Sequence, residues 1–121
     1  MTWINEGRHA GEFIVSEGNG RISREVITIT GGNFDAGTVL GKITASGKFT
    51  NLTPAANDGS QNAAAILFDN ARAAAADVKG VVVARMAEVK AAELVWPAGI
   101  TDAQKAAALA SLAAVNIIAR T

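Results

Sequence analysis

Short stretches of β-branched residues, separated by glycine-containing turns, restrict the fold of this chain more than any other feature. Residues 24–30 (REVITIT) are rich in valine, isoleucine and threonine and end at Gly31-Gly32. This composition favours a strand followed by a turn. Residues 37–44 and 48–52 are also apolar or β-branched, and the Ala-Ser-Gly sequence between them fits the tight loop of a hairpin.

The β pattern continues through two further segments. The NDGS sequence at 57–60 is typical of a turn and leads into residues 63–68, a short apolar stretch that predicts a strand. Residues 77–94 contain three consecutive valines and are compatible with one long strand or two. Many short strands with glycine-rich turns, here over about residues 21–96, indicate a small barrel or sandwich.

The C-terminal part changes to a helical pattern. Thr101 and Gln104 form the sequence signature of a capping box. The alanines and leucines that follow repeat at helical spacing and predict one helix near 101–115. Ile117 and Ile118 are expected to return to extended chain. The predicted fold class is therefore mainly β, with a minor α component.

The length of 121 residues predicts one domain, which we place at residues 21–121. Residues 1–20 are polar and contain glycine, without a sustained apolar period, so we expect a flexible N-terminal arm. Alanine supplies much of the apolar content, which predicts a thin core and favours packing between copies. The large apolar residues of the expected arm are Trp3, Ile4, Phe13, Ile14 and Val15.

Charge and composition exclude several classes of protein. The 11 basic and 11 acidic side chains balance, so the basic excess of a nucleic-acid-binding protein is missing. No apolar run is long enough for a transmembrane helix. Residues 1–6 lack the basic and apolar regions of a secretory signal, so we expect none. The chain has no cysteine and therefore neither disulfides nor thiolate metal ligands.

The residues that could carry chemistry are few and poorly placed. The single histidine, His9, lies in the expected arm, where a general base would lack rigid support. No serine lies in a nucleophile elbow. Asp58, Asp69 and Asp77 do not have the spacing of a calcium-binding loop, and their neighbours are ordinary turn residues. We therefore expect no enzyme activity, and no metal, cofactor or small-molecule substrate.

The two tryptophans are the strongest candidates for packing or recognition. Proline disfavours helix in the residue before it, so Trp96 is held extended by Pro97. This residue pair is interpreted either as part of the core that closes one end of the barrel, or as an anchor at a contact with another protein chain. Trp3 has no local core around it, which favours a docking role.

Three segments of the sequence, in order and spacing, resemble the head decoration proteins of tailed phages, typified by that of phage lambda. The first is Ala-Gly-Thr-Val-Leu-Gly-Lys-Ile at 36–43. The second is Asp-Gly-Ser at 58–60, which leads into Ala-Ile-Leu at 65–67. The third is Leu-Val-Trp-Pro at 94–97, followed by Thr101-Asp102 and the alanine-rich helix. The resemblance covers roughly residues 21–118.

This resemblance implies a mostly β protein that is made in the bacterial cytoplasm and assembles as a homotrimer on the outer surface of the virion. Such trimers occupy local three-fold positions of an expanded capsid and clamp neighbouring copies of the major capsid (coat) protein. In the family the N-terminal arm is disordered in the free protein and pairs with coat-protein strands on the capsid. The hypothesis for this chain is that Trp3 and Ile4, with Phe13 and Ile14, anchor the arm.

Two other functions fit a small β barrel. One is a component of another phage assembly, such as the tail. The other is a biotinyl or lipoyl carrier domain, which needs an exposed lysine at a hairpin tip. Lys42 lies within an expected strand, and Lys48 lacks the flanking residues of a carrier lysine.

Overall fold

The computed structural model of this protein describes residues 10–11, 13–17 and 22–120. Within that part the fold is mainly β, as the sequence predicts, and it contains one α-helix, α1 (Asp102–Ala113), and one short 3-10 helix, η1 (Ala91–Glu93). The strands are β1 (Ile14–Glu17), β2 (Arg24–Ile29), β3 (Asn33–Phe34), β4 (Val39–Lys42), β5 (Phe49–Asn51), β6 (Ala63–Leu67), β7 (Ala71–Arg72), β8 (Val78–Val83), β9 (Ala87–Lys90) and β10 (Ile117–Arg120).

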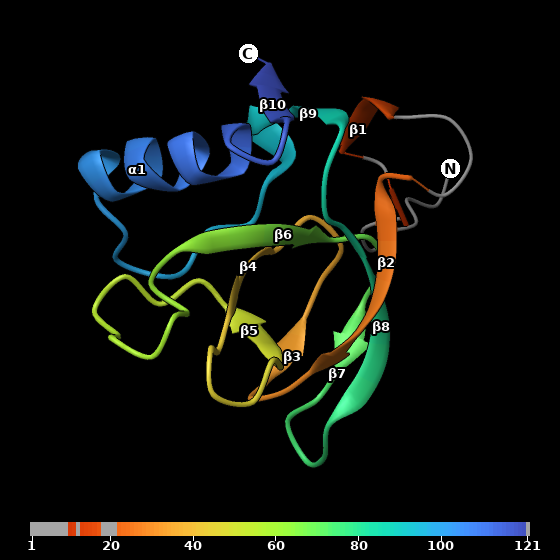
Figure 1. Cartoon of the computed structure of the whole chain (residues 1–121), viewed down its shortest axis with the longest axis vertical. Coiled ribbons are helices and arrows are strands. Elements are labelled where there is room, and N and C mark those ends of the chain that lie inside the picture. Colours follow the sequence, from red (N-terminus) through yellow and green to blue (C-terminus); the bar gives the residue numbers. More distant parts are fainter. Residues whose placement is uncertain (1–9, 12, 18–21, 121) are drawn as a thin grey trace, which may run out of the picture.

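Five strands form a closed barrel in the order β2-β5-β4-β6-β8 (Figure 1). The longest ladder joins β2 to β8 in antiparallel register, from Arg24 opposite Val83 to Ile29 opposite Val78. A single parallel pairing of Ile29 with Phe49 closes the barrel between β2 and β5. The hairpin expected from the Ala-Ser-Gly turn is confirmed, since β4 and β5 pair antiparallel.

The barrel interior follows from the alternation of side chains along the strands. Along β2, Ile29 is fully buried whereas Val26 is exposed, because successive side chains point to opposite faces of a strand. The interior holds an apolar cluster in which several of the buried residues are alanine. The buried members of this barrel cluster are Ile29, Leu40, Phe49, Ala65, Leu67, Ala71, Ala73 and Val82.

Gly41, the third residue of β4, lies close against the backbone of Ser60. A Cβ atom at this position would lie 2.7 Å from the Cα of Ser60 and would overlap the Ser60 carbonyl. We expect Gly41→Ala to destabilise the protein by about 3 kcal/mol, because the obstacle is backbone and cannot rotate away. Thermal unfolding followed by circular dichroism measures this. Gly47→Ala is the control, since its Cβ would meet open space and only its positive φ would cost about 1 kcal/mol. Equal losses in the two variants would contradict the steric argument.

A second layer covers one end of the barrel. It consists of α1 and a three-stranded sheet, β1-β9-β10, which we call the terminal sheet (Figure 1). β9 pairs antiparallel with β1 and parallel with β10. The main core lies between this layer and the barrel end. Its largest fully buried side chains are Phe13, Val39, Leu52, Ile66, Val83, Val89, Leu112 and Ile117.

The helix begins and ends as its sequence dictates. The Thr101 side chain accepts a hydrogen bond from the backbone N–H of Gln104 (3.1 Å), and the Gln104 side chain accepts one from the N–H of Thr101 (3.0 Å). This is the predicted capping box. After the helix, Asn116 adopts a left-handed conformation (φ 63°) that turns the chain into β10. Asparagine tolerates this conformation better than most residues.

For residues 13–17 the structure differs from the expected flexible arm at residues 1–20. Phe13 is fully buried in the main core, and residues 14–17 form β1, which pairs with β9. These residues belong to the folded domain in the structure, whereas the expected arm included them. The physical reason is that the barrel end and α1 provide a buried site for Phe13 that its neighbours in sequence do not reveal.

Candidate interaction surface

The three aspartates named above as candidate calcium ligands each contact a different partner in the structure. Asp58 Oδ1 accepts hydrogen bonds from the N–H (3.0 Å) and hydroxyl (2.6 Å) of Ser60. Asp77 pairs with Lys48 (2.6 Å), and Asp69 accepts a hydrogen bond from the Asn70 N–H (2.8 Å). Among the described residues no group of three or more potential ligands could hold a metal ion. His9 lies outside the described residues.

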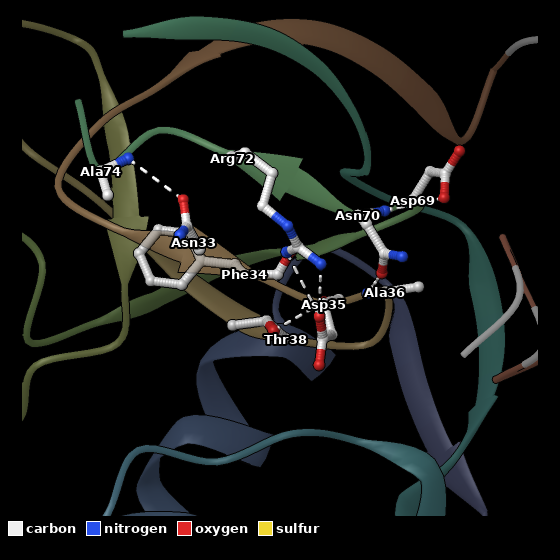
Figure 2. Close-up of polar contacts among 9 residues, drawn as sticks. All are labelled: Asn33, Phe34, Asp35, Ala36, Thr38, Asp69, Asn70, Arg72 and Ala74. Atoms are coloured by element: carbon white, nitrogen blue, oxygen red, sulfur yellow. Dashed lines mark hydrogen bonds and ion pairs between the residues drawn. The ribbon is translucent and has the colours of Figure 1, made fainter. Parts of the chain in front are cut away.

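A cluster of polar contacts connects the two strands of the small β3–β7 ribbon and the residues next to them (Figure 2). Arg72 donates to the Phe34 carbonyl (3.2 Å) and forms an exposed ion pair with Asp35 (3.3 Å). The Asn70 side chain accepts a hydrogen bond from the Ala36 N–H (2.8 Å). Each of these contacts joins residues 34–36 to residues 70–72, so the cluster fastens the β2–β4 connection to the β6–β8 connection. We assign it a structural role.

The two candidate carrier lysines each contact another side chain of the barrel. Lys48 donates to Asp77 at 2.6 Å across the outside of the barrel. The Lys42 ammonium lies 5.9 Å from the centre of the Phe49 ring, within the range of a cation–π contact. Neither lysine stands at a hairpin tip, because Lys42 ends β4 and Lys48 directly precedes β5.

Exposed apolar side chains gather on and around the terminal sheet. In the described part of the chain, four of the exposed large apolar residues belong to this sheet or to the turns that lead into it, whereas two lie on β2 and just before it. The exposed face of the helix, by contrast, carries mainly alanine and polar residues. The terminal-sheet residues are Val15, Met86, Val115 and Ile118, and the β2 residues are Ile22 and Val26.

The outer face of the terminal sheet contains a shallow hollow with charged side chains beside it. A shallow hollow of about 220 Å³ spans all three strands. Beside it, Arg120 on β10 forms an ion pair with Glu88 on β9 (3.0 Å). Lys90, which is opposite Arg120 in the register, adds an exposed positive charge to the same face. The residues that line the hollow are Ser16, Met86, Ala87, Glu88, Asn116 and Ile118.

Glu17, at the end of β1, fastens the terminal sheet to the chain that enters β2. Its carboxylate accepts hydrogen bonds from the Ser23 hydroxyl (2.8 Å) and from Arg24 Nε (3.1 Å), and it forms an ion pair with the Arg24 guanidinium. The hydrogen bond from Arg24 lowers the pKa of Glu17 below its usual 4.5, against a smaller opposing effect of burial. The Ser23 hydroxyl lowers this pKa further.

This lowered pKa predicts a pH-dependent stability. Because the pKa of Glu17 is lower in the folded than in the unfolded chain, its stabilising effect is complete above pH 4.5 and is lost as the pH falls through the folded-state value. We expect Glu17→Gln to unfold at a lower temperature than the parent protein at neutral pH, and the difference to shrink below pH 4.5. Calorimetry across this range tests it. A difference that does not change with pH would contradict the role of the charge.

The residues proposed from sequence as binding anchors occupy different places. Trp3 and Ile4 lie outside the described residues. Phe13 is fully buried, and Ile14 is half-buried against the same core. Trp96 is also half-buried and packs against the main core, and its role as a core residue or as a contact with another chain stays a prediction.

The Trp96-Pro97 pair is held by its neighbours on both sides. The preceding residue, Val95, accepts a hydrogen bond from the Val39 N–H (3.1 Å) and donates one to Gly37 (2.9 Å), which joins this segment to the start of β4. On the outer side, the Lys105 ammonium lies 6.0 Å from the Trp96 ring centre. Pro97 is half-buried and begins the loop that leads to α1.

Sequence reasoning missed Met86 and Val115 as surface residues. Their exposure depends on the turns that precede β9 and β10, and no sequence motif marks these turns. Ile118 was expected to be extended, which the structure confirms, but its exposed outer position follows only from the register of β10 against β9.

The described residues thus form a closed β barrel, and the terminal sheet that covers one end of it presents exposed apolar side chains. The sequence matches the family described as bacteriophage lambda head decoration protein D over residues 3–117. The chain therefore belongs to this family of phage head decoration proteins. A comparison with individually curated proteins finds no match. The family is structural and implies a location on the virion capsid. Among the described residues, no helix has the length and apolar character needed to span a membrane.

Proposed function

We propose that this decoration protein binds as a homotrimer to the outer surface of the expanded phage head and stabilises it by holding neighbouring coat-protein subunits together. The observation that carries the proposal is the exposed apolar face of the terminal sheet. Its first strand, β1, is the direct continuation of the N-terminal segment. The exposed face therefore includes the strand that follows the N-terminal segment in the sequence, and in this proposal both bind the coat protein.

The N-terminal segment acts as the anchoring arm in this proposal. Residues 1–9 contain two large apolar side chains, Trp3 and Ile4, which insert between coat subunits. Phe13 and Ile14 instead form the base of the arm, since both pack against the main core. An extended segment that adds a strand to an exposed sheet edge gains main-chain hydrogen bonds, and alternate side chains fill pockets.

Trimerisation makes weak arms effective. Ordering one arm costs conformational entropy, so a single arm binds weakly. Three arms on one rigid trimer bind together, and the high effective concentration raises the overall affinity by about 10²–10⁴-fold. Because the arms bind subunits that only expansion brings into place, decoration stabilises the expanded lattice by mass action.

Co-sedimentation of the purified protein with expanded and unexpanded heads tests the proposal, with light scattering of the free protein alongside. We expect saturable binding to expanded heads only, at one trimer per three-fold site, and a higher unfolding temperature of the decorated heads. Equal binding to both kinds of head would contradict selection of the expanded state. Binding to tails, with none to heads, would replace the proposal with a role in tail assembly.

A further inference from the structure

Met86 adopts a backbone conformation that does not suit it. It lies in the turn between β8 and β9 at φ 55°, in the left-handed region. Among the described residues other than glycine, only Met86 and Asn116 have a positive φ. Asparagine tolerates this region, whereas a long side chain there is strained.

The two left-handed residues lie in adjacent turns, which makes the contrast between them informative. The Met86 N–H donates to the Val115 carbonyl (3.2 Å), and the next N–H, of Ala87, donates to the Asn116 carbonyl (3.0 Å). The two turns thus share hydrogen bonds and a similar conformation. One has the residue that suits this conformation, and the other has methionine.

Burial does not compensate for the strain at Met86. Its side chain is 45% exposed, and Ile118 and Val115 beside it are 36% and 37% exposed. Together with Ser16 and Asn116, Met86 and Ile118 line the hollow on the outer face of the terminal sheet. A strained residue whose side chain remains in solvent is best explained by a contact that the free protein does not contain.

We propose that Met86 is a docking anchor for the coat protein, and that with Val115 and Ile118 it forms a second, rigid contact beside the N-terminal arm. This inference rests on the proposed function. The coat protein is the occupant because the face is continuous with the arm, since Ser16 of β1 lines the same hollow. The proposed contact is apolar at its centre, because Met86, Val115 and Ile118 are all exposed there. The unbranched, flexible side chain of methionine adapts to the small differences between neighbouring lattice sites.

The variant Met86→Asn separates this role from a role in folding. Asparagine relieves the strain, so we expect the unfolding temperature of the free protein to rise by about 2–4 °C. Loss of the anchor should weaken binding to expanded heads by about tenfold. Thermal unfolding of the free protein and titration of heads by co-sedimentation measure the two effects. A variant that is more stable and yet binds less well is the expected signature.

Matched variants make the experiment decisive. Ile118→Asn should also weaken head binding, whereas Ala45→Asn, in the exposed turn between β4 and β5, should not. Undiminished binding of Met86→Asn, where the parent protein binds, would overturn the inference and leave the proposed function intact. A loss of affinity together with a lower unfolding temperature would also overturn it, since damage to the fold would then explain the loss. A change in the size of the free oligomer would place Met86 between copies instead, and a parent protein that does not bind would refute the proposed function itself.

Discussion

A variant that lacks residues 2–9 should fold like the parent protein and lose nearly all of its affinity for expanded heads. The described fold begins at Ala10 and Gly11, where the Gly11 N–H donates to the Phe68 carbonyl (2.8 Å), so this deletion spares the main core. The affinity should fall by about 10²–10⁴-fold, because three arms that bind together are removed at once. Unfolding temperature and head co-sedimentation measure the two properties.

Two further variants show where in the arm the effect originates. Replacing both Trp3 and Ile4 by alanine keeps the length of the segment and should reproduce most of the loss. A longer deletion, of residues 2–15, should instead destabilise the whole domain, since it also removes Phe13 and Ile14. If the protein without residues 2–9 bound heads as tightly as the parent, the arm would have no part in decoration, and binding would have to come from the rigid surface.

The barrel was predictable because its strands are specified locally. The β-branched run of β2, the glycine-containing turn between β4 and β5 and the NDGS turn before β6 each carry their own signal. The capping box of α1 is equally local, since both of its hydrogen bonds join residues three positions apart. Where the sequence left open one strand or two between residues 77 and 94, the left-handed turn at Met86 divides the segment into β8 and β9.

The terminal sheet was harder to predict because distant residues create it. β1 has four residues and a register shift between Ile14 and Ser16, so it has no clear alternation of apolar and polar side chains. Its partner β9 lies about 70 positions further along the chain. The candidate surface was hidden for the same reason, since the sequence does not reveal the backbone angle at Met86 or the register of β10. Family membership locates the function on the phage head, whereas the binding face proposed above is inferred from exposed side chains that only the structure reveals.

The large effect of residue 13 on stability follows from its position in the main core. We expect Phe13→Ala to destabilise the protein by about 3–5 kcal/mol, which corresponds to a fall of about 12–20 °C in unfolding temperature for a domain of this size. The ring is fully buried in a cluster that includes Val89, Leu112 and Ile117, so its truncation leaves a cavity in the main core. The Phe13 carbonyl also accepts a hydrogen bond from the Lys90 N–H (2.8 Å), so loosening of this residue would weaken the β1–β9 pairing.

Val15→Ala on the same strand is the matched control. Val15 is half exposed, so its truncation should change the free energy of unfolding by about 0.5 kcal/mol or less. Thermal unfolding of the two variants and the parent protein, followed by circular dichroism, gives the comparison directly. If Phe13→Ala unfolded at the parental temperature but failed to bind heads, Phe13 would belong to the arm, as the polar sequence around it first indicated. A large loss of stability for Phe13→Ala alone would instead show that the folded domain begins before residue 13. The apolar anchors of the arm would then be Trp3 and Ile4.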